Sequence, residues 1–329
     1  MSKMQMLVLM SVCSLVFVSI FVLDSMEQRY FLNKLVHLNE SLSGLVIPKT
    51  PTQLQAPAEM EIPRRLGSKP EEETKKKKIN KPVLFIGVFS GPTSKHRYNR
   101  DVIRMTWWND VEQLEAEYQV HARFLIGKTQ DLRQQRLNEE ERTKYGDLVI
   151  LDMEDSYYNL WEKSYLMFNH SLACCGADYF IKVDDDCFMN PRLFMEYAKP
   201  KLDPRMLYGN MVMNGLPDRN PNSKYYISKE EYPRDILPTY PSGIGYMVGK
   251  AVMRFVVNNA VERLTHLKID DINIGLWVEK AEEMGEFVPV YVQQKLGECG
   301  EDDAIVVHFI RPESRICAWK HNRGLSGCC

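Results

Sequence analysis

Three consecutive carboxylates, Asp184, Asp185 and Asp186, have the type and spacing that metal and phosphate chemistry requires. They follow the apolar, β-branched run Tyr179–Val183, and apolar residues resume at Cys187. This pattern predicts a buried strand that delivers carboxylates to the edge where open α/β sheets bind ligands. If the backbone stays extended, Asp184 and Asp186 lie on one side and suit Mn²⁺ or Mg²⁺, which would hold a diphosphate. The alternative is a solvated acidic turn.

A second carboxylate pair, Asp270 and Asp271, stands just before an apolar helical pattern that includes Trp277. Carboxylates at this position can be simple helix caps, since they favour that end of the helix dipole. The capping and chemical interpretations both remain open on these residues alone. Upstream, Gly243 and Gly245 are too few for a dinucleotide fingerprint, and we expect them to let the backbone approach a substrate closely.

The elements that position these residues alternate between strands and helices. Apolar strand patterns cover 83–90, 121–126, 148–151 and 179–183, and helical patterns cover 97–108, 139–145, 160–172 and 250–261. The alternation predicts an α/β fold with a parallel-type sheet and helices on its faces. The segment from Leu207 to Val248 is less regular. The net charge is −2 over 329 residues, so the chain lacks the strong positive electrostatic potential that would indicate nucleic acid as a partner.

The N-terminus predicts a membrane anchor. Residues 4–23 carry no charge, and Lys3 precedes them while Asp24 follows. We therefore expect a cytosolic tail (1–3), a transmembrane helix (4–23) and a luminal chain beyond it. A cleaved signal peptide is the rival, but Ser19–Leu23 is too bulky for a cleavage site.

Residues 24–80 are rich in proline and charge and predict a solvated stem, followed by a catalytic domain at 81–329. Seven cysteines follow the predicted span, which permits up to three disulfide bonds in an oxidising lumen. Asn39 and Asn169 begin N-glycosylation acceptor patterns, and Asn169 falls in a predicted helix.

Five stretches in chain order carry specific patterns: Arg100–Trp107 (Arg-x-x-Ile-Arg-x-Thr-Trp), Phe124–Gly127, Asp155–Lys163 (Asp-Ser-Tyr-x-Asn-Leu), Lys182–Asp186 and Tyr240–Tyr246. Together they resemble the β-1,3-glycosyltransferases, the galactosyltransferase and N-acetylglucosaminyltransferase group with the GT-A fold. The chain departs from that family at Asp270, where the family has glutamate, and at Trp161 and Trp108. The C-terminal tail resembles the galactosyltransferases that build proteoglycan or arabinogalactan chains.

The resemblance implies a fold, a compartment and a reaction. The fold is a GT-A-like open sheet flanked by helices, and the enzyme is a single-pass type II Golgi membrane protein with a luminal catalytic domain. The expected donor is UDP-galactose or a related UDP-sugar, and the acceptor is a glycan or glycoprotein. β-1,3 linkage from an α-linked donor inverts the anomeric carbon, which needs a base at the acceptor hydroxyl.

The resemblance also implies roles for particular residues. Asp184, Asp186 and His308 are the expected ligands of Mn²⁺ (or Mg²⁺), and Asp184 and Asp185 also face the nucleotide sugar. Arg104 and Lys163 are the expected cations near the diphosphate. Asp271 is the expected base, with Asp270 as its neighbour.

Three alternatives stay open. The first is a β-1,3-N-acetylglucosaminyl- or N-acetylgalactosaminyltransferase. A non-catalytic luminal glycan-binding protein would keep the fold and lose the carboxylates. A metal-dependent hydrolase would also cluster carboxylates, but no HxH or HExxH pattern is present.

Overall fold

The computed structural model describes residues 81–294, 304–308 and 311–325, and all of them belong to one compact unit, Lys76–Cys329. The predicted tail, membrane anchor and stem, residues 1–80, lie outside the described residues, as does Asn39. Within the described ranges, no helix combines the length and apolar character that crossing a bilayer requires.

The elements alternate through the first half of the unit, as the sequence predicts. The strands are β1 (Val83–Phe89), β2 (Gln119–Lys128), β3 (Leu148–Glu154), β4 (Tyr179–Asp184), β5 (Cys187–Met189), β6 (Met206–Val212), β7 (Tyr240–Gly249), β8 (Val290–Gln293) and β9 (Val306–His308). The helices are α2 (Ser94–Met105), α3 (Leu132–Tyr145), α4 (Leu160–Cys175), α5 (Pro191–Ala198), α6 (Lys250–Arg263), α7 (Asp270–Glu283) and α8 (Pro312–Asn322), with 3₁₀ turns η1 (Trp107–Ala116), η2 (Tyr157–Asn159) and η3 (Lys199–Lys201).

Seven of these strands form one mixed sheet in the order β3-β2-β1-β4-β7-β6-β8. The first four are parallel, whereas β7 runs antiparallel to both β4 and β6. The expectation of an α/β sheet flanked by helices is confirmed. The continuous parallel run ends at β4, and β6 and β8 form a separate parallel pair beyond β7. A small second sheet pairs β5 with β9, and Cys187 lies opposite His308 in it.

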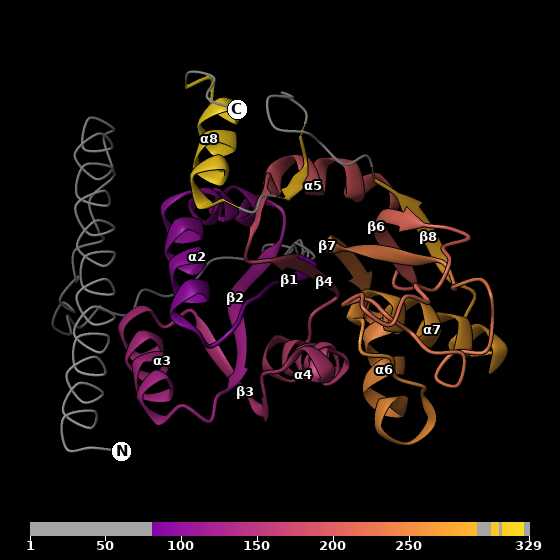
Figure 1. Ribbon diagram of the computed structural model, residues 1–329. Coiled ribbons are helices and arrows are strands. Elements are labelled where there is room, and N and C mark those ends of the chain that lie inside the picture. The colour runs from indigo at the N-terminus through magenta and orange to yellow at the C-terminus, as the bar shows by residue number, and fades with distance from the viewer. Residues whose placement is uncertain (1–80, 295–303, 309–310, 326–329) are drawn as a thin grey trace, which may run out of the picture. The chain divides into compact units, whose positions relative to one another are not determined.

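Helices cover both faces of the large sheet, because alternate strand residues point to opposite sides. On one face, Phe168 of α4 packs edge-on against Phe180, which stacks on Phe85 at 5.3 Å between ring centroids. The helices α6 and α7 extend the same core. Figure 1 shows α4, α6 and α7 below the sheet and α5 above it. On the other face, Trp108 of η1 stacks on Phe124 at 4.3 Å.

Two local expectations need correction. The helix predicted over 97–108 ends at Met105, because Thr106 leaves helical geometry (φ −120°, ψ −117°) and its hydroxyl bonds back to the Val102 carbonyl. Cys174, Cys175 and Cys187 carry free thiols, which leaves four of the seven predicted luminal cysteines for disulfide bonds. Asn169 lies in α4, as predicted, with an exposed side chain.

Candidate active site

A cavity of about 780 Å³ opens at the carboxyl ends of β1 and β4. The start of β7, the start of α7, the β3–α4 connection and the last residue of β9 complete its wall. Its lining comprises residues 89–93, 155–157, 184–186, 242–244 and 269–271, together with His96, Thr129, Leu160, Lys163, Lys224, Tyr225 and His308. The predicted carboxylates of both clusters therefore face one space, although 84 residues separate Asp186 from Asp270 in the chain.

The two carboxylate clusters are joined by a buried cation, Lys182. Its ammonium lies 2.7 Å from Asp184 Oδ1 and 3.6 Å from Asp270 Oδ2, and it also donates to the Gly243 carbonyl. Burial lowers the pKa of Lys182, but the charges of Asp184 and Asp270 outweigh it and raise the pKa above its ordinary value. Desolvation within the cavity raises the pKa of Asp184 to about 6, against the effect of Lys182. Lys182 thus couples β4, β7 and α7 at the cavity floor.

Asp186 and His308 meet across the small sheet. His308 Nε2 lies 3.2 Å from Asp186 Oδ2, and both side chains stay half-exposed to the cavity. Among the described residues, no three or more histidine, cysteine or acidic side chains converge closely enough to hold a metal ion by themselves. The Asp186 carboxylate nevertheless matches the way Mg²⁺-like ions bind, through one or two carboxylates plus substrate phosphates, whereas the His308 imidazole is a ligand that suits transition-metal ions better than Mg²⁺.

Asp185 is the most enclosed of the three aspartates. Its Oδ2 accepts hydrogen bonds from Ser90 Oγ at 2.6 Å and from His96 Nδ1 at 2.7 Å, and its Oδ1 accepts one from Asn99 Nδ2 at 3.0 Å. Burial raises the pKa of Asp185, but the bonds and charge from His96 and Ser90 outweigh it and lower the pKa. Its backbone carbonyl accepts from Arg315 of α8. Asp185 therefore fixes β4 against α2 and α8.

Asp271 lies in the first turn of α7 and faces the start of β7. Its Oδ2 accepts the Gly243 N–H at 3.1 Å, and its Oδ1 accepts the Ile272 N–H at 2.9 Å. Desolvation and the adjacent charge of Asp270 raise the pKa of Asp271 to about 7. The N-cap residue of α7 is Ile269 and not either aspartate. A carboxyl group poised near neutrality and held by backbone donors can accept a proton from a bound hydroxyl.

The two predicted diphosphate cations lie in different places. Lys163 lines the cavity, donates to the Ser90 carbonyl and pairs with Asp155 at 2.8 Å. Arg104 lies outside the cavity lining, where it pairs with Asp147 and Glu141 at 2.8 Å each. Because the guanidinium is committed to these acids, we leave Arg104 out of the proposal that follows.

Of the three departures from the family pattern, Asp270 lines the cavity, whereas Trp108 and Trp161 lie away from its lining. Trp108 stacks on Phe124, and Trp161 stacks on His266 at 3.8 Å. Neither tryptophan therefore lines the candidate active-site cavity.

Lys182 and His96 are site residues that the sequence reasoning missed. Lys182 carried a usable signal, since a charge inside an apolar strand, two residues before Asp184, lies on the same side as that aspartate. His96 carried none, because its partner Asp185 is 89 residues away.

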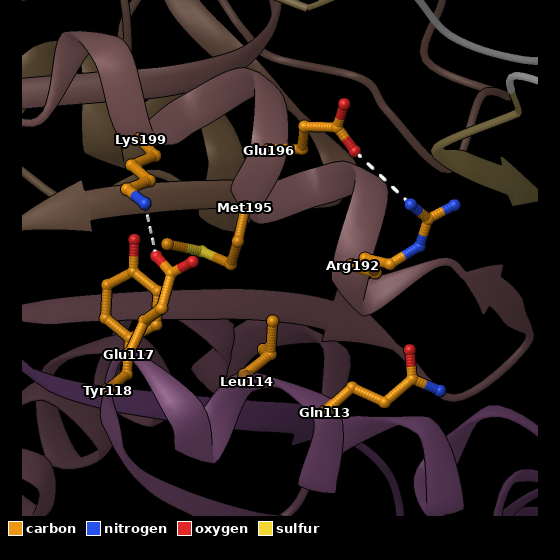
Figure 2. A pocket seen from close by; sticks show the side chains of 8 residues that line it. All are labelled: Gln113, Leu114, Glu117, Tyr118, Arg192, Met195, Glu196 and Lys199. Carbon is orange, nitrogen blue, oxygen red and sulfur yellow. Dashed lines mark ion pairs between the residues drawn. The ribbon is translucent and has the colours of Figure 1, made fainter.

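A second cavity, of about 300 Å³, lies between η1 and α5 (Figure 2). Leu114, Tyr118 and Met195 form its apolar part, and the ion pairs Glu117–Lys199 (2.5 Å) and Arg192–Glu196 (3.5 Å) border it. Its lining contains none of the predicted site residues, so the larger cavity is the candidate active site.

Comparison with known proteins identifies the family. The family described as Galactosyltransferase matches residues 98–283, which is more than half of the chain. The chain belongs to the galactosyltransferase family. The matched residues of this galactosyltransferase-family chain include Asp184, Asp185, Asp186 and Asp271, whereas His308 follows them.

Individual relatives of this galactosyltransferase-family chain support the β-1,3 group. Beta-1,3-galactosyltransferase 5 of Pan troglodytes is 30% identical over 69% of this chain and 79% of its own length. Beta-1,3-galactosyltransferase 1 of Mus musculus is 31% identical over 62% of both chains. A solved glycosyltransferase involved in glycosylation of the major capsid of PBCV-1 covers 71% of this chain at 12% identity, with a TM-score of 0.34, which is too low to support any inference.

Proposed function

We propose that this chain is an inverting β-1,3-galactosyltransferase that moves galactose from UDP-galactose to a hydroxyl of a glycan acceptor. The observation that carries the proposal is the placement of Asp271, with its pKa near 7, in one cavity with Asp184, Asp186 and His308. The cavity thus offers a proton acceptor and a separate set of ligands for a charged leaving group. An inverting transfer needs both in a single in-line attack.

In this proposal Asp271 removes the proton from the attacking acceptor hydroxyl. The Gly243 and Ile272 N–H groups orient its carboxylate, so that little reorganisation accompanies the reaction. Lys182 holds Asp270 and Asp184 as paired charges and prevents their mutual repulsion from opening the site. Asp185 orients His96 at the cavity wall.

Asp186 and His308, with Asp184, are the residues that would hold Mn²⁺ or Mg²⁺ together with the diphosphate oxygens. The ion, when bound, stabilises negative charge on the departing UDP. Lys163, at the same cavity, adds a cation on the side of Asp155 and Ser90. We further propose that residues 4–23 anchor the enzyme as a type II protein in the Golgi membrane.

UDP release tests the proposal. The purified protein is assayed with UDP-galactose, UDP-N-acetylglucosamine and UDP-N-acetylgalactosamine, with and without saccharide acceptors, in Mn²⁺ and in EDTA. We expect acceptor-dependent release from UDP-galactose that EDTA abolishes. Release from UDP-N-acetylglucosamine alone would reassign the donor, and phosphate release from simple esters would point to a hydrolase.

A further inference from the structure

The connection from β6 to β7, residues 213–239, is held in a defined conformation by its own hydrogen bonds. Arg219 donates hydrogen bonds of 2.6–2.8 Å to four backbone carbonyls of this segment: those of Ile227, Ser228, Tyr232 and Arg234. The Ile227 N–H also donates to the Asp218 carbonyl at 2.8 Å. One side chain near the start of the segment thus holds residues 227–234 in place.

The same segment is packed against the helix that carries Asp271. Ile227, Tyr232 and Leu237 are buried with three residues at the start of α7 and just before it: Leu267, Ile269 and Ile272. Because Ile272 directly follows Asp271, this apolar cluster fixes the segment relative to the proposed base.

Two half-exposed tyrosines project into the cavity near that base. Tyr225, which is 48% exposed, comes from the segment, and Tyr157, which is 38% exposed, comes from the β3–α4 connection. Lys224 lies over the Tyr225 ring, 4.6 Å from its centroid. At the wall of one cavity, two such rings offer apolar area with a polar hydroxyl at the tip, which a bound ligand can cover.

Electrostatics place the rings close to the proposed base. Desolvation raises the pKa of Tyr157 to about 12, and the charges of Tyr225, Asp270 and Asp271 add to it. These charge contributions agree with the shared lining of the cavity, since all four groups line it.

We propose that Tyr157 and Tyr225 form the acceptor platform, on which the apolar C–H face of a pyranose ring packs so that its hydroxyl meets Asp271. This inference rests on the proposed function, since it takes Asp271 as the base. The platform suits a neutral saccharide, because an aromatic ring offers apolar area with a polar hydroxyl at its tip. The uracil of the donor is the competing occupant, and it would have to lie beside the base, away from Asp186 and His308.

Steady-state kinetics of Tyr157→Ala and Tyr225→Ala test the platform. We expect the acceptor KM to rise about tenfold in each variant, which is the usual scale of one aromatic contact. The donor KM should stay within twofold. Tyr225→Phe keeps the ring and should retain the wild-type acceptor KM. Tyr158→Ala is the matched control, because Tyr158 is 73% exposed and lies outside the cavity lining.

An unchanged acceptor KM in both alanine variants would overturn the platform, and a raised donor KM would assign the rings to uracil. If an alanine variant unfolds, the acceptor KM of the corresponding leucine variant, which keeps apolar volume without the aromatic ring, is measured in its place. Saturation-transfer NMR with methyl β-galactoside and methyl β-N-acetylglucosaminide separates this inference from the proposed function. If the wild type binds a glycoside through these rings but transfers no sugar, the platform stands and the transferase proposal fails.

Discussion

The arginines of the Arg100–Trp107 motif should prove structural, and Glu141→Gln tests this. Glu141 is fully buried, and its two oxygens accept three hydrogen bonds: from Arg100 Nε at 2.8 Å, Arg100 Nη2 at 2.5 Å and Arg104 Nη2 at 2.8 Å. Glutamine keeps the shape but removes the charge and turns an amide toward a guanidinium donor. Breaking a buried ion pair costs about 3–5 kcal/mol, because the remaining charge stays buried and uncompensated.

For a domain of this size, such a loss lowers the melting temperature by about 6–20 °C. Thermal denaturation followed by circular dichroism gives the shift, and calorimetric titration with UDP gives the affinity below the transition. Glu196→Gln removes a half-exposed pair with Arg192 and should change the melting temperature by about 1 °C or less. We expect UDP affinity in Glu141→Gln to stay within threefold. A melting temperature within about 2 °C of wild type, or lost UDP binding with an unchanged melting temperature, would refute the structural role.

Four further outcomes are expected from the geometry of the site. A pKa of about 7 for Asp271 in the free enzyme means that its ionised fraction rises from about 9% at pH 6 to about 91% at pH 8, so kcat/KM should rise about tenfold. Folding raises the pKa of Asp271, so its contribution to the free energy of unfolding is largest at low pH and is lost as pH rises toward 7. Urea unfolding at several pH values measures this change. Gly243→Ala places a methyl group 3.2 Å from Asp271 Oδ2 and should lower kcat by about tenfold, with the melting temperature reporting any wider damage. Asp186→Ala should weaken UDP binding in Mn²⁺ to the level that the wild type shows in EDTA. If EDTA still weakens UDP binding to Asp186→Ala, the metal ligands lie elsewhere.

The strands and helices that could be predicted are those with a local apolar pattern. The runs that became β1 and β4 are continuous and largely buried, those that became β2 and β3 are buried in part, and the alternation with helices indicated the sheet correctly. The strands β5 and β9 are only three residues long and pair across more than a hundred residues, so no local pattern marks them. The antiparallel insertion of β7 likewise depends on long-range pairing.

Contacts between residues far apart in the chain also decide which roles of site residues could be predicted from the sequence. Asp184, Asp186, Asp271 and His308 were predicted from motif spacing and family resemblance, and the structure brings them to one cavity. A positive residue on a predicted helix looks the same locally whether it faces a phosphate or a buried acid. Arg104 meets its acids, Glu141 and Asp147, about forty residues further along the chain, and nothing in its own motif reveals that contact.

The assignment of Asp271 as the base is tested most directly by turnover of Asp271→Asn beside Asp270→Asn. Asparagine keeps the size of Asp271 and, through its single oxygen, one of the two bonds from Gly243 and Ile272, so UDP and Mn²⁺ should bind nearly as in the wild type. We predict that Asp271→Asn lowers kcat by about 10²–10⁴ and that Asp270→Asn, whose partner is Lys182, costs much less. Near-normal turnover of Asp271→Asn, or a dead Asp270→Asn beside an active Asp271→Asn, would contradict the assignment.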